Sequence, residues 1–375
     1  MDKNLLGGLS PRTFLRDYWQ KKPLLIRNAI PGFSGLLERD ALFEMARDED
    51  IESRFIAHDD RAWQLERGPL PKRLLRRPVS TPWTVLVQGL NLLLPEADAL
   101  MRRFAFIPYA RLDDVMVSYA TDGGGVGPHF DSYDVFLLQG TGRRRWQISA
   151  QKDLSLVDGA PLRILRNFVP EQEWVLEPGD MLYLPPHYAH NGIAEGECTT
   201  YSVGFRAPSA QELGTAFLDH LRDRLCLRGM YADPDLAVQT DPAQLPAAMV
   251  DRVAGMLQDI HWSRNEIEQF LGGYLSEPKP HVFFDPPDEP ATAKRFARKA
   301  ARSGVRLDAR TQLLRSGRRF WINGEAVEVP AGVHATLRTL ASTRSLATVG
   351  EDDTALHLLH DWYCDGFLHV GARDG

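Results

Sequence analysis

The middle of the chain, from about residue 112 to residue 205, consists of short β-prone segments separated by glycine and proline. Branched and aromatic residues dominate each segment and turn-forming residues follow it, which is typical of strands in an antiparallel structure. The predicted strands cover residues 115–119, 135–139, 145–148, 181–184 and 200–205. The turn at residues 140–142 is expected to join the second and third strands as a hairpin. Many short strands with regular turns predict a mainly β barrel or sandwich, as in jelly rolls.

Helical patterns flank this β-rich region on both sides. Before it, residues 10–50 are predicted to be largely helical around a short buried strand at 23–27, with a helix at 39–47. A further helix is predicted at 85–94. After it, apolar residues recur at helical spacing in three stripes. The stripes are Leu213, Phe217, Leu221 and Leu225; Met249, Val253, Met256, Leu257 and Ile260; and Ile267, Phe270 and Leu271.

A proline-rich stretch at residues 278–290 has the composition of a linker. Beyond it, a basic helix, two short strands around Asn323-Gly324 and a final pair of helices predict a small α+β domain. We therefore expect a β core with N-terminal helices at 1–207, a helical region at 208–277, a linker at 278–290 and a C-terminal domain at 291–375.

The composition excludes several classes of protein. The three cysteines, Cys198, Cys226 and Cys364, are far apart and form no CxxC pair, which argues against a disulfide framework or a zinc–thiolate site. The N-terminal residues contain no apolar run typical of a signal peptide. No stretch approaches the ~18 apolar residues that a membrane span requires. A cytoplasmic protein without membrane contact is expected.

A possible metal site begins at His129-Phe130-Asp131, after the glycine-rich residues 123–127. Residues i and i+2 of a strand point to the same side, so both polar side chains can face a barrel interior. Two histidines and one carboxylate form the facial triad of non-haem Fe(II) oxygenases. The second histidine would come from the PGD-strand-PP segment at residues 178–190, which offers His187 and His190. An HxD pattern alone also fits a simple polar pair, but the two segments together favour a metal site.

Three segments, GGGVGPHFDSYDVFLLQGTGRRRW, LEPGDMLYLPPHYAHNG and YSVGFRAP, resemble the JmjC-type ribosomal oxygenases. The similarity is to the bacterial branch, which hydroxylates an arginine of the sixteenth large-subunit ribosomal protein, and FLRDYWQKKPLLIRNA resembles that branch too. The resemblance implies a cupin or double-stranded β-helix core with iron held by His129, Asp131 and His190. Related sequences often have glycine at the position of His187, so we expect His187 to be a loop residue.

The same resemblance implies 2-oxoglutarate as cosubstrate, together with dioxygen. 2-Oxoglutarate chelates iron through its oxo acid end, and its distal carboxylate requires a cation such as a guanidinium. Strand alternation places Arg144 on the same face as Trp146, and Arg143 and Arg145 on the other. The family pattern places the carboxylate-binding base at Arg144, and Ser118 at a position that hydrogen-bonds the same molecule.

Alternation along the strand also places Asp114 and Met116 on the face of Ser118. A substrate arginine needs a carboxylate for its guanidinium and apolar walls for its methylene groups. Asp114 and Met116 could supply these, and Tyr133 could form a further wall. The alternative is that Asp114 caps the start of the strand and that Met116 belongs to the core.

The function that these patterns favour is Fe(II)- and 2-oxoglutarate-dependent hydroxylation of an arginine in a ribosomal protein. Two alternatives remain, a ribosomal protein histidine hydroxylase and a non-catalytic cupin that senses a ligand and binds DNA. Nothing in the sequence identifies the methyl-lysine cage of a demethylase. The regulator alternative explains the barrel and the basic C-terminal domain, but it does not predict an intact triad together with Arg144.

The resemblance has two implications for the rest of the chain. The helical region would form a homodimer interface, and the C-terminal domain would be winged-helix-like. Residues 291–320 contain ten basic residues and one acid, but few aromatic residues lie between them. We therefore expect a solvated basic face rather than sequence-specific nucleic-acid binding.

Overall fold

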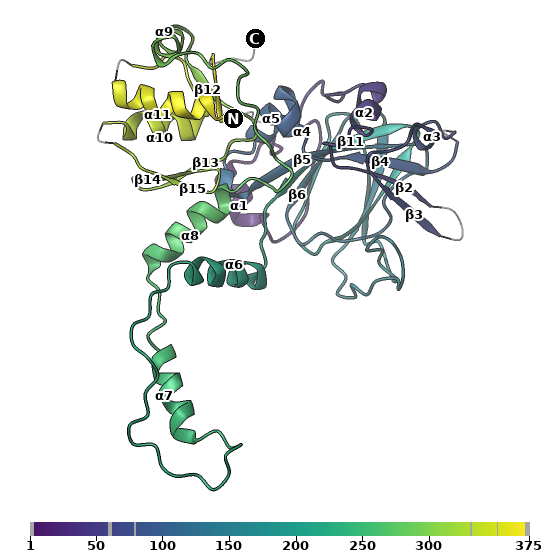
Figure 1. The fold of residues 1–375 in the computed structure, drawn as a ribbon. Coiled ribbons are helices and arrows are strands. Elements are labelled where there is room, and N and C mark those ends of the chain that lie inside the picture. Colours follow the sequence, from purple (N-terminus) through teal and green to yellow (C-terminus); the bar gives the residue numbers. More distant parts are fainter. Residues whose placement is uncertain (1–3, 59–61, 79, 331, 351, 372–375) are drawn as a thin grey trace.

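The computed structural model describes the chain except for residues 1–3, 59–61, 79, 331, 351 and 372–375. A sheet-rich core carries a smaller C-terminal domain, and a helical arm projects away from both (Figure 1). Among the described residues, no helix is long and apolar enough to cross a membrane.

Two antiparallel sheets build the core, which confirms the mainly β barrel-like expectation. The larger sheet has the order β1-β9-β6-β11-β5-β4-β2-β3, and the smaller has the order β10-β7-β8. The large-sheet strands are β1 (Leu24–Ile26), β2 (Ser53–His58), β3 (Trp63–Arg67), β4 (Trp83–Val87), β5 (Leu112–Ala120), β6 (Val135–Gln139), β9 (Met181–Leu184) and β11 (Cys198–Phe205). The small-sheet strands are β7 (Arg143–Ser149), β8 (Gln172–Leu176) and β10 (Ala189–Glu195).

The predicted hairpin between residues 135–139 and 145–148 is wrong. Strand β6 pairs with β9 and β11 in the large sheet, whereas β7 pairs with β10 and β8 in the small sheet. The turn between them carries the chain from one sheet to the other, and it is fixed to the start of β11 by hydrogen bonds to Thr199. A glycine turn between two apolar runs predicts a change of direction, but it does not specify the pairing partner.

The predicted helix at residues 85–94 is also wrong in its first part. Residues 83–87 form β4, in which all five residues are buried, and only Leu90–Leu93 form a helical turn, α4. Gly89, with a left-handed φ of 69°, separates the two elements. A short apolar run buried on both faces has no helical or strand periodicity, so the sequence pattern could not distinguish the two.

Helices cover the outer face of the large sheet. They are α1 (Pro11–Asp17), α2 (Arg39–Met45), α3 (Lys72–Leu75) and α5 (Pro95–Arg102). The ring of Phe14 on α1 lies 4.9 Å from that of Tyr183 and 5.5 Å from that of Phe136. On β5, Val115 and Val117 face this core, which leaves the alternate residues for the barrel interior.

The helical arm consists of α6 (Ala210–Arg222), α7 (Ala247–Leu257) and α8 (Arg264–Ser276). Its middle helix, α7, projects away, whereas α8 packs against the C-terminal domain, with Gly272 beside the ring of Trp321. Capping boxes start α6 and α8, with Ser209 and Ser263 each accepting a hydrogen bond from the backbone of a glutamate three residues later. The first and third apolar stripes of the sequence therefore lie on α6 and α8, except for Leu225, which follows the end of α6, and the second stripe lies mainly on α7.

The C-terminal domain has its own apolar core, which includes Phe296, Leu337 and Leu359. Its helices are α9 (Ala293–Ser303), α10 (His334–Thr343) and α11 (Asp353–Cys364). Its strands are β12 (Val305–Leu307), β13 (Leu313–Ser316), β14 (Arg319–Ile322), β15 (Glu325–Val327), β16 (Ser345–Leu346) and β17 (Leu368–Val370). The predicted basic helix, the strands around Asn323-Gly324 and the final pair of helices are confirmed.

Candidate metal centre and cosubstrate pocket

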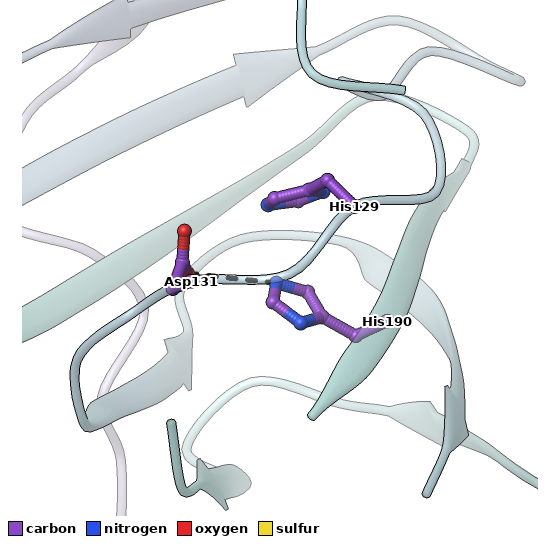
Figure 2. A group of neighbouring side chains, drawn as sticks. All are labelled: His129, Asp131 and His190. Carbon is purple, nitrogen blue, oxygen red and sulfur yellow. Dashed lines mark ion pairs between the residues drawn. The ribbon is translucent and has the colours of Figure 1, made fainter. Parts of the chain in front are cut away.

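The side chains of His129, Asp131 and His190 lie together inside the barrel (Figure 2). One ligand atom from each lies within 4.8 Å of the others. The Nε2 atom of His190 is 3.7 Å from the Oδ2 atom of Asp131, and the two imidazole rings have centroids 4.2 Å apart. Two imidazoles and one carboxylate converging on one point are the donor set of an Fe(II) facial triad.

The backbone that holds the triad is less regular than we expected. His129 pairs with His190 through one isolated antiparallel bridge, with N···O distances of 2.9 and 2.8 Å. Asp131 follows outside any strand, so the expectation that both residues lie in a regular strand is wrong. Instead, the carbonyl oxygen of Asp131 accepts a hydrogen bond of 2.7 Å from the backbone N–H of His187, which fixes the loop beside the ligand.

His187 serves this loop through its backbone, while its side chain is exposed. Its φ of 61° is in the left-handed region, which glycine adopts without strain. Its side chain is not part of the group that converges on the centre within the described residues. The expectation of a loop imidazole fits this position.

Both candidate histidine ligands are oriented by backbone carbonyls. The Nδ1 atom of His129 lies 2.9 Å from the Gly127 carbonyl oxygen, and that of His190 lies 2.9 Å from the Tyr188 carbonyl oxygen. Because a carbonyl oxygen can only accept, each Nδ1 carries a proton, and each Nε2 offers a lone pair to a metal. Burial, followed by the nearby His129, lowers the pKa of His190 to about 4, so the imidazole is neutral at neutral pH.

Arg144 lies buried in the adjoining pocket with an exposed fraction of 3%. Its Nη2 atom is 3.6 Å from the sulfur of Cys198, and its Nε atom has no hydrogen-bond partner among the described residues. The indole Nε1 of Trp146, on the same face of β7, is also buried without an acceptor in that part of the chain. A buried guanidinium is costly unless it is paired with an anion. The two donors therefore fit the distal carboxylate of 2-oxoglutarate.

The neighbouring arginines behave as surface residues. Arg143 is exposed and lies 3.6 Å from Glu195, while the partly exposed Arg145 pairs with Glu173 at 2.5 Å. The predicted alternation of the three arginines is thus confirmed, with Arg144 alone facing inward.

Ser118 lies on the interior face of β5, close to the same pocket. It is opposite Thr200 on β11, and two residues further along β5 Ala120 is opposite Cys198, which contacts Arg144. The Oγ atom of Ser118 is 3.4 Å from the Thr200 carbonyl oxygen, a weak hydrogen bond that leaves the hydroxyl available to another acceptor.

The predicted substrate residues Asp114, Met116 and Tyr133 also gather near the interior face of β5. At Gly204, an added Cβ atom would lie 3.2 Å from Oδ1 of Asp114 and 4.0 Å from Cε2 of Tyr133. Glycine at this position therefore leaves space between the carboxylate and the phenol ring. Tyr133 is 41% exposed, so it stands at the mouth of this space rather than in the core.

Two residues that the sequence did not indicate, Arg54 and Gln88, complete this wall. Arg54 on β2 donates from Nη2 to Oε1 of Gln88 at 3.0 Å and approaches the sulfur of Met116 at 4.0 Å. Burial raises the pKa of Asp114, and the like charge of Asp113 adds to the rise, while the positive charge of Lys279 and hydrogen bonds from the Gly89 backbone and from Gln88 oppose it. Arg54 thus orients Gln88, and Gln88 holds Asp114. An arginine before the apolar residues Phe55, Ile56 and Ala57 of β2 was the available signal, but that strand was not predicted.

Comparison with known proteins places this site in a family. Residues 99–213 match the JmjC domain, and residues 256–369 match the ROXA-like winged helix. Ribosomal protein uL16 3-hydroxylase of Escherichia coli (strain K12) is 34% identical over 322 residues, which are 84% of this chain and 85% of that protein. The chain belongs to the JmjC ribosomal oxygenase family.

The solved structures of this family agree over the full fold. A crystal structure of E. coli YcfD is 32% identical and has a TM-score of 0.85, covering 96% of this chain and 98% of that chain. A second YcfD structure, 31% identical with a TM-score of 0.83, covers the same shares and is described as a ribosomal oxygenase in complex with cobalt and 2-oxoglutarate. The JmjC or cupin core and the winged-helix domain are confirmed, and the donor set fits Fe(II) and 2-oxoglutarate.

Proposed function

We propose that this chain is an Fe(II)- and 2-oxoglutarate-dependent dioxygenase that hydroxylates an arginine of ribosomal protein uL16. The observation that carries the proposal is the convergence of His129, Asp131 and His190, together with the buried Arg144, whose Nε has no hydrogen-bond partner among the described residues. The similarity to uL16 3-hydroxylase over 84% of the chain supports the ribosomal substrate.

The residues of the site have separate roles. His129, Asp131 and His190 would hold Fe(II), and Arg144 and Ser118 would hold 2-oxoglutarate through its distal carboxylate. When bound, the metal and 2-oxoglutarate together supply the oxidising power to hydroxylate an unactivated carbon with dioxygen. The barrel around Arg144 excludes water from this reaction.

Asp114 supports arginine as the side chain that enters. Its half-buried carboxylate provides a charge partner for a guanidinium, and Met116 and Tyr133 provide walls for the methylene groups. Gln88 holds the carboxylate in place, and Arg54 holds Gln88. A guanidinium can form a charged, two-point contact with this carboxylate that a neutral imidazole cannot, which favours arginine over histidine.

We propose in addition that the active form is a homodimer joined through the helical arm. None of the residues of α7 is buried, and Val250, Val253 and Leu257 are 54%, 40% and 55% exposed. Short isolated helices are marginal in water, and an exposed apolar stripe normally has a partner surface. A second copy of the arm would cover it, and a ribosomal substrate implies action in the cytoplasm.

Mass spectrometry on purified large-subunit ribosomal proteins tests the proposed reaction. The protein is loaded with Fe(II) without oxygen, mixed with 2-oxoglutarate and the ribosomal proteins, and then exposed to air. We expect uL16 alone to gain the mass of one oxygen atom, on an arginine located by fragmentation, and no gain with Asp131→Ala. A modified histidine would replace the arginine proposal. Sequence-specific DNA binding without any succinate would instead favour a non-catalytic regulator.

A further inference from the structure

Helix α9 presents a continuous basic face to solvent. The side chains of Lys294, Arg295, Arg298, Lys299 and Arg302 are all exposed. The helix contains no acidic residue, and no ion pair joins these five side chains to an acid in the described part of the chain. The basic residues recur at spacings of three and four, so they share one side of the helix.

The apolar side of α9 fixes this orientation. Phe296 and Ala300 have no exposed surface, and the ring of Phe296 lies 5.2 Å from that of Tyr363 on α11. The helix cannot rotate about its axis without exposing this core, so the basic side is held outward. Figure 1 shows α9 at the outer edge of the C-terminal domain, away from the barrel.

This face differs from the rest of the molecular surface. The whole chain has a formal net charge of -6. Some exposed arginines elsewhere pair with acids, such as Arg166 with Asp158 at 2.7 Å and Arg222 with Asp219 at 2.9 Å. A local group of unpaired positive charges on an acidic protein attracts a polyanion.

We propose that α9 binds the phosphate backbone of ribosomal RNA without reading its sequence. From residue 294 to residue 302 the basic side extends about 12 Å along the helix axis. A duplex carries one negative charge per about 1.7 Å of its axis, so five cations can meet phosphates over this length. This site is separate from the catalytic centre, and it rests on the proposed function only in naming ribosomal RNA as the ligand.

The buried aromatic residues explain why the contact is independent of sequence. Phe296, the one aromatic residue of α9, is 0% exposed, and Phe320 on β14 is 2% exposed, so neither ring can stack on bases. Recognition of single-stranded bases commonly uses exposed aromatic rings. The contact proposed for α9 is therefore the attraction between its positive charges and phosphate groups.

Other classes of partner fit this face less well. Helices that bind membranes insert an apolar face, but the apolar face of α9 is already buried in the domain core. A ribosomal protein that itself binds RNA is basic and would be repelled by α9. The face therefore complements the RNA of the particle to which such a substrate belongs, rather than the substrate protein.

Fluorescence anisotropy with a labelled hairpin of ribosomal RNA tests the proposal on the full Fe(II)-loaded chain. In the test variant, Lys294, Arg295, Arg298, Lys299 and Arg302 are all replaced by alanine, which favours the helix. Five phosphate contacts predict that log K falls with log salt concentration with a slope of about -3.5 to -4.5. We expect the variant to bind at least about tenfold more weakly at 50 mM salt, with a much smaller slope.

A matched control removes two exposed arginines of the same domain, Arg315→Ala with Arg318→Ala, and should retain the affinity and most of the slope. Equal RNA affinity of the wild type and the α9 variant would overturn the proposal. So would binding of the wild type to vesicles of anionic lipid but not to RNA. Hydroxylation of free uL16 is measured in parallel and should not change, because α9 lies outside the catalytic pocket. If the wild type does not hydroxylate uL16, the proposed function is contradicted, but the RNA-binding result is unaffected.

Discussion

Arg144 differs from Arg143 and Arg145 mainly in the direction in which strand β7 turns its side chain. The two neighbours reach acidic partners at the surface, while Arg144 is enclosed and lacks a partner for Nε among the described residues. A positive charge held in this way is a binding site for an anion, because the cost of desolvation has already been met in the folded chain.

Arg144→Ala should raise the KM for 2-oxoglutarate. Loss of a buried charged contact to a carboxylate commonly costs about 2 to 5 kcal/mol, so we expect a rise of at least about thirtyfold. Initial rates of succinate formation at varied 2-oxoglutarate measure the effect. Arg143→Ala is the matched control and should change the KM by less than about twofold. A similar rise in both variants would contradict the inward role of Arg144.

Asp114→Asn should weaken the binding of the substrate arginine while leaving 2-oxoglutarate binding intact. The variant keeps the shape of the side chain but removes its charge, so the KM for a uL16 peptide should rise at least about tenfold. Gln88→Ala should act in the same direction with a smaller effect, since it removes the hydrogen bond that holds Asp114. Peptide kinetics at saturating 2-oxoglutarate measure both. An unchanged KM for Asp114→Asn would show that this carboxylate is not the receptor.

At the scale of single residues, the alternation of side chains between the two faces of a strand was enough to predict which side chains of β5 and β7 face the interior. Asp114, Met116, Ser118 and Arg144 all lie on the predicted sides. Arg54 and Gln88 were not found, because they lie on or directly after strands that the sequence pattern did not identify.

Among the elements, the strand pairings were harder to predict than the strands. The residues of β6, β7, β9 and β11 were found from composition and turns, but the partners of β6 and β7 were not. In a two-sheet barrel, a chain that leaves one sheet can enter the facing sheet through a turn as short as a hairpin turn. Local sequence does not encode that choice, which depends on distant strands such as β11.

The apolar stripe of α7 leads to a prediction about assembly. Val253→Glu together with Leu257→Glu should convert a dimer into a monomer, because two charges would have to be buried in the proposed interface. Light scattering after size-exclusion chromatography measures the mass. Asp251→Ala with Arg252→Ala, on the same helix, is the control and should remain dimeric. A monomeric wild type would contradict the proposed role of α7.

At the scale of the whole molecule, the C-terminal domain folds around its own core and carries a buried charge network. Burial alone would raise the pKa of Asp308, but hydrogen bonds from His369 and Arg310 outweigh it and hold the pKa well below the usual range. In the unfolded chain the pKa of an aspartate carboxyl is about 3.9. The stabilisation is therefore complete well above that pH and is lost as the pH falls through and below it.

Asp308→Asn should consequently lower the stability of the C-terminal domain at pH 7 by about 1 to 3 kcal/mol. The difference from the wild type should shrink as the pH falls through about 3.9 toward 3, because the carboxyl of the unfolded wild type then becomes protonated while that of the folded wild type is still ionised, so that folding must release a proton. Urea unfolding followed by tryptophan fluorescence at several pH values measures this. Asp365→Asn, at an exposed position, should show little difference at any pH. A constant deficit for Asp308→Asn across the range would contradict the electrostatic explanation.

The central claim is that His129, Asp131, His190 and Arg144 form one centre for Fe(II) and 2-oxoglutarate. Anaerobic titration of the protein with both, followed by visible absorption, tests it without any assumption about the protein substrate. Chelation of Fe(II) by the oxo acid produces a charge-transfer band. We predict a band that saturates at one Fe(II) per chain in the wild type, requires more 2-oxoglutarate in Arg144→Ala, and is absent in Asp131→Ala. A band of equal strength in Asp131→Ala, or none in the wild type, would contradict the account.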